Sequence, residues 1–168
     1  MIYEGRALVI AQDNVDTDVL YPGQFLNVLD PREMTRYLFE GLDPGLRDRL
    51  APETILVAAE NFGTGSSREN VPLAMRAAGI RCLVARSFAR IFHRNCVNLG
   101  LPALACPEAA AAARDGSTIR IEPATGEITV DGQTFLAQPL PPFMLELLDA
   151  GGLVPWVRAR LAPAEPAT

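Results

Sequence analysis

The apolar residues in the middle of this chain form short continuous runs separated by helical stripes. Residues 54–59, 80–85 and 101–105 are such runs, and this pattern is typical of strands that are covered on both faces. Between them, apolar residues recur at three- and four-residue spacing and predict two helices, which end at Gly79 and Gly100. Strands and helices in this order predict βαβ crossovers and a parallel sheet.

The segment before this region contains one strand and several turns. Residues 6–11 are expected to form the strand, and the polar residues 12–24 are expected to contain no helix because they are acidic and interrupted by turn-forming residues. Asp30 and Pro31 are the residue types that favour a helix N-cap and a first helical position. A short further element is expected at residues 46–50.

The C-terminal third of the chain has short strand-like runs separated by glycine turns, a pattern that favours antiparallel hairpins. The three expected strands are residues 117–121, 127–130 and 133–137. A last helical segment begins after Pro142 and breaks at Gly151. We therefore expect one α/β domain over residues 1–160, with central parallel strands, flanking helices and short antiparallel strands, and a frayed tail over 161–168.

The bulk composition excludes several classes of protein. With 49% apolar and 21% charged residues, the chain has the composition of an ordinary globular domain. Its net charge of −5 and pI near 4.9 argue against a nucleic-acid partner, because phosphate binding needs a basic face. No apolar run approaches the roughly 18 residues that span a bilayer, and the N-terminus lacks the features of a signal peptide. A cytoplasmic location without membrane contact is expected.

The metal-ligating residue types are few and scattered. The cysteines Cys82, Cys96 and Cys106 include no C-x-x-C pair, so neither a disulfide framework nor a metal site is expected in this chain. Cys82 lies in an apolar run and is expected to be a core residue. His93, the one histidine, lies in a predicted helix, where packing is a better explanation than ligation.

Residues 61–70 (NFGTGSSREN) form a glycine-rich turn between a predicted strand and a predicted helix. Ser66, Ser67 and Arg68 are expected at the helix start, where free backbone N–H groups favour anions. One interpretation is a cradle for an anionic substrate, in which a serine can lose its proton. The other is a capped turn, completed by Glu69, and these residues alone favour neither. The turn is neither a Walker loop nor a hydrolase elbow, because GK[ST] and G-x-S-x-G are both absent.

Residues 13–18 (DNVDTD) place three carboxylates at close spacing. A calcium loop counted from Asp13 would need glycine and glutamate where the chain has Asp18 and Gln24, so that interpretation fails. Two interpretations remain. The side chains bond their own loop, or they hold an arginine or a substrate hydroxyl.

Three arginines, Arg86, Arg90 and Arg94, are spaced by four along the predicted second helix. They share one face, which is suited to an anion or to an acidic partner, although a solvated helix face is the commoner outcome. Ser87 is expected to cap this helix.

Three stretches together resemble one family. Residues 16–22 (DTDVLYP), 61–69 (NFGTGSSRE) and 87–95 (SFARIFHRN) look like motifs of the swivel domain of the aconitase superfamily. More narrowly, the chain resembles the small subunits of 3-isopropylmalate dehydratase and its homoaconitase relatives, from about Gly5 to Val157. The resemblance implies a swivel-type β/β/α fold.

The same resemblance implies a hydro-lyase of leucine biosynthesis, which moves a hydroxyl between neighbouring carbons of a 2-hydroxy diacid. It implies a separate large subunit that carries a [4Fe–4S] cluster, in a heterodimer or heterotetramer, and no cofactor on this chain. Ser66 matches the serine whose alkoxide abstracts the proton beside a carboxylate. Ser67 and Arg68 match residues that hold substrate carboxylates, and Thr17 and Asp18 are expected beside the substrate.

Some positions depart from the family pattern. Thr64 and Asn70 stand where cysteine and histidine are usual in these small subunits. Asn27 matches the position that contacts the variable substrate substituent, which is apolar in isopropylmalate enzymes and arginine in homoaconitases. We expect Asn27 to bind substrate, and a homoaconitase or a dimethylmalate-type dehydratase is the alternative. A non-catalytic binding subunit of this fold is another alternative, and a serine hydrolase is disfavoured because only His93 could serve as its base.

Overall fold

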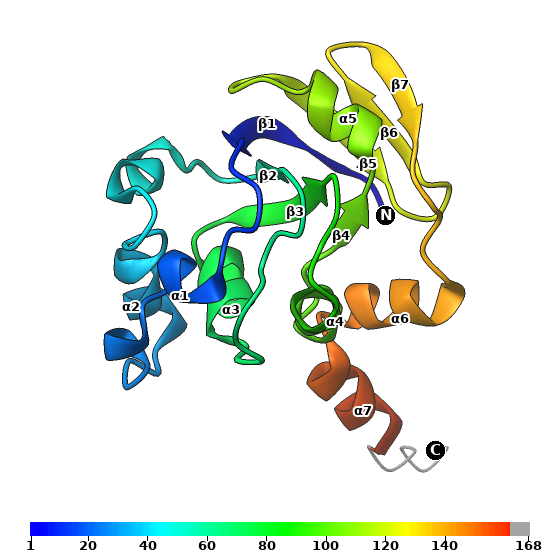
Figure 1. Cartoon of the computed structure of the whole chain (residues 1–168). Helices are drawn as coiled ribbons and strands as arrows, with labels where there is room; N and C mark the ends of the chain where they lie inside the picture. Colours follow the sequence, from blue (N-terminus) through cyan, green and yellow to red (C-terminus); the bar gives the residue numbers. More distant parts are fainter. Residues whose placement is uncertain (162–168) are drawn as a thin grey trace.

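The computed structural model describes residues 1–161. Within them, seven strands form one mixed sheet in the order β4-β3-β2-β1-β5-β6-β7 (Figure 1). The strands are β1 (Tyr3–Ile10), β2 (Thr54–Ala58), β3 (Ile80–Ala85), β4 (Ala103–Ala105), β5 (Thr118–Glu122), β6 (Glu127–Val130) and β7 (Gln133–Leu136).

Strand β1 joins the two halves of the sheet. Its residues 7–10 pair with β2 in parallel, and its residues 3–6 pair with β5 in the antiparallel direction. Strands β2, β3 and β4 continue the parallel half, while β6 and β7 continue the antiparallel half. The predicted parallel centre and the predicted C-terminal hairpins are therefore both confirmed.

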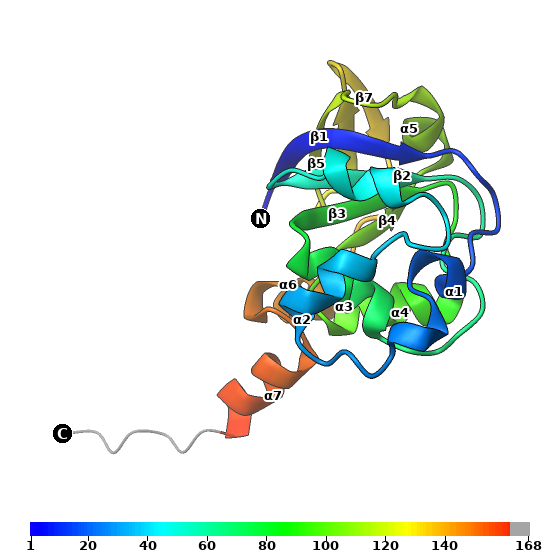
Figure 2. The same ribbon diagram turned by 90° about the vertical axis from the view of Figure 1, so that its left-hand side faces the viewer.

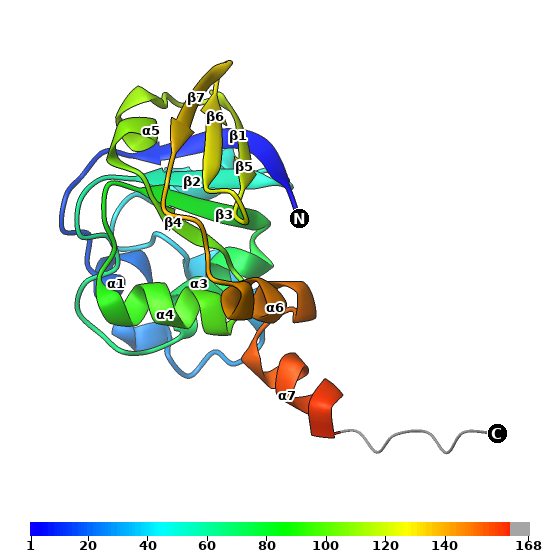
Figure 3. The same ribbon diagram turned by 90° about the vertical axis from the view of Figure 1, so that its right-hand side faces the viewer.

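Short helices cover the two faces of the sheet. They are α1 (Thr17–Leu20), α2 (Pro31–Met34), α3 (Asn70–Ala77), α4 (Arg90–Asn98), α5 (Pro107–Ala112), α6 (Pro142–Ala150) and α7 (Leu153–Leu161). Three 3₁₀ turns accompany them, at Gly23–Phe25, Thr35–Tyr37 and Pro44–Arg49. Figures 2 and 3 show α1 to α4 on one face of the parallel strands and α5 on the opposite face.

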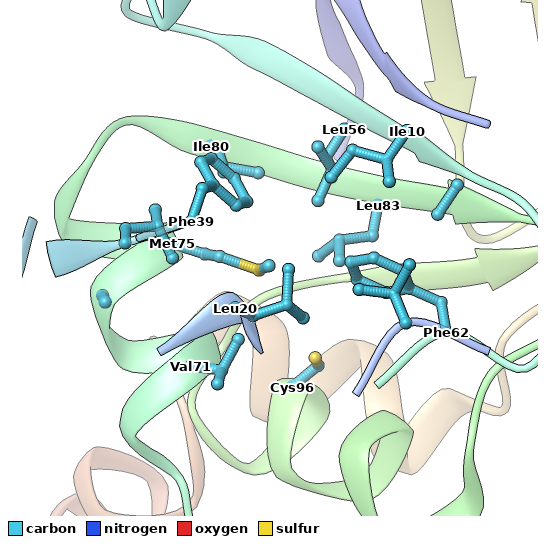
Figure 4. Packing of buried hydrophobic residues seen from close by; sticks show 14 of the residues in the cluster. Ile10, Leu20, Phe39, Leu56, Phe62, Val71, Met75, Ile80, Leu83 and Cys96 are labelled. Atoms are coloured by element: carbon cyan, nitrogen blue, oxygen red, sulfur yellow. The ribbon is translucent and has the colours of Figure 1, made fainter. Parts of the chain in front are cut away.

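Each face of the parallel strands has its own hydrophobic core. On the face covered by α3 and α4, strand residues such as Leu56 and Leu83 pack with Phe62 and Met75 (Figure 4). Their strand neighbours point the other way and pack against α5 and the antiparallel strands. Burial on both faces explains why the apolar runs in the sequence are continuous rather than alternating.

The prediction of no helix in residues 12–24 was wrong. Helix α1 forms a single turn there, and the Asp16 carboxylate caps it by accepting a hydrogen bond from the Asp18 N–H at 2.7 Å. The Thr17 N–H is bonded to the Thr64 carbonyl at 2.9 Å. A turn this short is held by its cap and by a distant segment, neither of which produces a helical period in the sequence.

Two further helix features differ from the sequence prediction. Ser87 does not cap α4, whose N-cap residue is Ala89 and makes no side-chain capping bond. Instead the Ser87 hydroxyl accepts a hydrogen bond from the Asn61 N–H at 2.8 Å, which ties the end of one loop to another. Helix α5 was not predicted, because six residues are too few to show a periodic pattern.

The C-terminal helices follow the expected break. Helix α6 ends at Gly151, whose left-handed φ of 83° fits a C-terminal glycine, and α7 follows it. Leu161 is the last residue of α7, and the rest of the expected frayed tail lies outside the described residues. Among residues 1–161, none of the helices has the length and apolar character needed to cross a bilayer.

Candidate active site

Two loops that are distant in the sequence come together at the carboxyl ends of β1 and β2. The Val15 carbonyl accepts hydrogen bonds from the Gly63 and Thr64 N–H groups at 2.9 and 3.2 Å. Asp16 and Thr64 form an isolated parallel bridge. The acidic segment after β1 therefore lies beside the glycine-serine turn after β2 and is hydrogen-bonded to it, so that the two motifs form one site.

The two glycines of this turn are required by close approach as well as by backbone angle. Gly63 has a φ of 82°, and a Cβ there would lie 2.2 Å from the Phe92 ring. Gly65 has a φ of 91°, and a Cβ there would lie 2.3 Å from an Asp16 carboxylate oxygen. Both positions exclude larger residues, since L-residues are strained at these angles and the space is already filled.

Ser66 is held at its backbone and at its hydroxyl. Its N–H donates to the Thr17 hydroxyl at 3.0 Å. Its Oγ accepts two hydrogen bonds from Arg68, from Nε at 2.6 Å and from the backbone N–H at 3.1 Å. Two donors on one hydroxyl oxygen, one of them cationic, favour negative charge on that oxygen.

The polar residues around Ser66 differ in exposure. Thr17 is buried, at 3% exposed, whereas Asp18 and Arg68 are open to solvent. The Arg68 Nη2 lies 3.7 Å from an Asp18 oxygen, so their interaction is a weak, solvent-screened one. Both charged groups remain accessible to a ligand.

Ser66, Ser67 and Arg68 do not begin the helix, contrary to the sequence prediction. Helix α3 starts at Asn70, and the three residues form an extended turn before it. Glu69 is the N-cap residue and makes no side-chain capping bond. The first N–H groups of α3 therefore belong to residues that follow this segment, and the donors beside the Ser66 hydroxyl are those of Arg68.

Asn95, in α4, is hydrogen-bonded to this turn. The sequence analysis assigned it no role. Its side chain is 6% exposed, and its Nδ2 donates to the Ser67 carbonyl at 2.9 Å. A longer contact of 3.5 Å reaches the Arg68 carbonyl. Asn95 stands within the third motif of the sequence, but the motif alone does not show which segment its amide contacts.

Ser66 stands between two hollows. A small one of about 10 Å³ has about the space of one water molecule. It is lined by Thr17, Asp18, Tyr21, Leu26, Ser66, Arg68, Asn70 and Val71. Leu26, rather than the expected Asn27, is the residue of its loop in this lining, and Asn27 and Ser67 are exposed.

A larger hollow of about 540 Å³ lies on the other side of Ser66. It is lined by Asn61, Gly63, Gly65, Ser66, Ala89, Arg90, Ile91 and Arg94. Two of the three arginines in the sequence series, Arg90 and Arg94, thus lie beside the turn. Arg86 does not, because it lines a separate hollow with the alanines of α5.

Comparisons with known proteins agree with this geometry. The aconitase C-terminal domain family matches residues 47–109. The 3-isopropylmalate dehydratase small subunit of Moorella thermoacetica is 45% identical, over 96% of this chain and 98% of the relative. The chain belongs to this family of dehydratase small subunits. The family and the α/β swivel-type fold that the motifs predicted are thereby confirmed.

A relative named for another substrate and a solved structure also match this chain. The 2,3-dimethylmalate dehydratase small subunit of Eubacterium barkeri is 46% identical, over 88% of this chain and 91% of the relative. A solved 3-isopropylmalate dehydratase structure from Methanocaldococcus jannaschii matches with a TM-score of 0.88 and 36% identity, over 95% of both chains. The dehydratase small-subunit fold therefore extends through nearly the whole chain.

The thiols of this small subunit do not fit an iron–sulfur cluster. Cys82, Cys96 and Cys106 are all buried, and they lie on β3, in α4 and just before α5. Burial raises the pKa of the Cys82 and Cys96 thiols, which disfavours the thiolate that a metal needs. Within residues 1–161, no three His, Cys, Asp or Glu side chains gather as a metal site.

Proposed function

We propose that this chain is the small subunit of a 3-isopropylmalate dehydratase-like hydro-lyase. With a large subunit that carries a [4Fe–4S] cluster, it isomerises a 2-hydroxy diacid by dehydration and rehydration. The observation that carries the proposal is the pair of hydrogen bonds from Arg68 to the Ser66 Oγ. Family membership and the fit to the solved dehydratase structure support it.

Ser66 is the proposed base that abstracts the proton from the carbon beside a substrate carboxylate. A serine hydroxyl is a poor base unless its alkoxide is stabilised, and donors directed at the oxygen supply that stabilisation. The guanidinium and the backbone N–H of Arg68 are such donors. Ser66 returns the same proton, or one from solvent, when the hydroxyl is added back.

The remaining site residues hold the substrate. The Arg68 guanidinium is exposed beside Ser66, and the Ser67 hydroxyl is open to solvent, so both can bind a carboxylate that lies over the small hollow. Thr17 fixes the Ser66 backbone, and Asp18 orients Arg68. Asn27 is assigned to the variable end of the substrate; it is exposed and follows the lining residue Leu26 in the sequence.

The large subunit has to complete the site. When bound there, the cluster supplies the Lewis acid that draws away the substrate hydroxyl. This chain contributes the proton-transferring serine and the carboxylate-binding groups. The assembly is a heterodimer or heterotetramer in the cytoplasm, and small malate or citrate analogues, including dimethylmalate, are the candidate substrates.

Replacement of Ser66 by alanine tests the proposal in the reconstituted complex. Formation of the alkene product from 2-isopropylmalate, homocitrate and 2,3-dimethylmalate is followed by absorbance, and complex formation is followed by size-exclusion chromatography. We expect kcat to fall by about 10³-fold or more, the scale of losing a catalytic base, with assembly intact. Wild-type complex that turns over none of the three substrates would overturn the proposal, and unchanged kcat in Ser66→Ala would identify a non-catalytic binding subunit.

A serine hydrolase is disfavoured by the position of His93. Its Nε2 lies 2.9 Å from the Ala103 carbonyl, and the ring lines a hollow that does not include Ser66. No imidazole is therefore placed to activate the serine. Failure of a serine-directed phosphonate to label Ser66 is the expected result.

A further inference from the structure

The outer face of α4 beside Ser66 carries two cations that no part of residues 1–161 neutralises. Arg90 and Arg94 are exposed and one helical turn apart. Neither takes part in the ion pairs or side-chain hydrogen bonds of these residues. The hollow that they line contains no carboxylate. In a chain with a net charge of −5, this is a local excess of positive charge.

An apolar side chain lies between the two arginines. Ile91 is 46% exposed, whereas the next residue of the same helical turn, Phe92, is buried at 1% exposed. An exposed isoleucine flanked by arginines matches the composition of a protein interface, where apolar residues form the centre and arginine is enriched.

We infer that Arg90, Ile91 and Arg94, here called the α4 face, form a docking surface for an acidic, centrally apolar surface of the large subunit. The inference rests on the proposed function. Charge complementarity selects this occupant, since in a two-fold contact a second copy of the chain would place the same cations opposite each other. The hollow lined by the α4 face includes Ser66, so a partner docked there reaches the mouth of the site.

The same arginine series provides a matched control. Arg86 is also exposed, but it lines the hollow formed with α5 and the ends of β1 and β2. Reversing its charge makes the same change in net charge as a single reversal at Arg90 or at Arg94, without touching the α4 face. A difference between the variants therefore measures position rather than overall charge.

The test compares Arg90→Glu, Arg94→Glu and the double variant Arg90→Glu/Arg94→Glu with Arg86→Glu in binding to the cluster-loaded large subunit, and each single variant is matched in net charge to Arg86→Glu. We expect the double variant to raise the Kd about tenfold or more at low salt, and the difference to shrink as salt screens the charges. With the double variant at saturating concentration, kcat is expected to be retained. Arg86→Glu is expected to bind like the wild type.

The outcomes separate this inference from the proposed function. Wild-type chain that fails to bind the large subunit would overturn both, whereas wild-type binding and equal binding by the double variant would overturn the α4 face alone. A raised KM for the diacid with unchanged subunit Kd would assign the arginines to substrate instead. A change in the oligomeric state of the small subunit alone would assign the face to self-association, and either result would contradict the inference.

Discussion

At the scale of single residues, the role proposed for Ser66 depends on neighbours that fix it in place. Thr17 holds its backbone N–H, and Arg68 directs two donors at its hydroxyl. Asn95 fixes the next carbonyl along the turn, and Gly65 allows the chain to pass directly against Asp16. The serine motif was visible in the sequence, but the Asn95 contact joins α4 to a loop 28 positions earlier and appears only in the structure.

Replacement of Gly65 by alanine should damage the site through a steric clash. The new Cβ would lie 2.3 Å from an Asp16 oxygen, so Asp16 would have to leave its position as the cap of α1. Gly116→Ala is the matched control, because its φ of 79° is equally left-handed but nothing lies within 4 Å. Both variants lose about 1 kcal/mol or more from backbone strain.

Thermal denaturation and kinetics of the two variants check this expectation. Gly65→Ala should be the less stable of the pair and should lose most of its kcat/KM in the reconstituted complex. Gly116→Ala should retain activity. Equal stability and equal activity would contradict a space requirement at Gly65.

Asn95→Asp should lower kcat/KM, because Asn95 holds the turn that carries Ser66, Ser67 and Arg68. A carboxylate oxygen would replace the Nδ2 that donates to the Ser67 carbonyl, and two acceptors would then face each other in a buried position. The free energy of unfolding should fall by about 1–3 kcal/mol. Steady-state kinetics should show the loss in kcat/KM, and Asn98→Asp, which adds the same charge about one turn later in α4, should leave kcat/KM unchanged.

At the scale of elements, the long periodic segments were predictable and the short ones were not. Strand β3 was expected at residues 80–85 and is found at Ile80–Ala85. Helix α1 was missed, and α3 was expected to start too early. Such short helices and helix starts depend on a cap or on hydrogen bonds to another loop, which leave no periodic pattern in the sequence. The glycine turn expected between residues 130 and 133 is formed by Asp131 and Gly132, whose φ values of 47° and 88° are both positive.

The hairpin of β6 and β7 makes a pH-dependent contribution to stability. Hydrogen bonds from the Ser117 side chain and then from the Thr118 N–H lower the pKa of the Asp131 carboxyl below its usual value. A depressed folded-state pKa stabilises the protein above the unfolded-state pKa, near 4, and the stabilisation is lost as the pH falls through the folded-state value.

Asp131→Asn should therefore lower Tm slightly at pH 7 and have a vanishing effect at strongly acid pH. Asparagine tolerates the same positive φ, so the turn is retained and only the charge is removed. Tm measured from pH 7 down to pH 3 gives the test, with Asp48→Asn, an exposed carboxylate outside the hairpin, as the charge control. A Tm difference that stays constant across this range would contradict the assignment.

At the scale of the whole molecule, the proposed site residues lie together at the carboxyl ends of the central strands β1 and β2. The turn before α3, the segment after β1 and the outer face of α4 meet around Ser66. The small hollow has about the space of one water molecule, so under the proposed function the substrate lies over it and the large subunit covers it from outside. The family resemblance predicted this division between two subunits. The sequence spacing put Arg86, Arg90 and Arg94 on one face. In the structure Arg86 directly follows β3 and lines another hollow, whereas Arg90 and Arg94 belong to α4 and lie beside Ser66.

The buried thiols give a test of the proposal that the large subunit, and not this chain, binds the iron–sulfur cluster. Cys82 and Cys96 are 0% exposed, Cys106 is 2% exposed, and burial raises the pKa of the first two. Thiolates are the species that bind iron and react with alkylating agents, so the native small subunit should be slow to alkylate and should bind no iron–sulfur cluster. After unfolding in guanidinium, all three thiols should alkylate rapidly, as read by mass spectrometry. Reconstitution with iron and sulfide should give cluster absorption only when the large subunit is present. Cluster absorption by the native small subunit alone would contradict the assignment of the cluster to its partner.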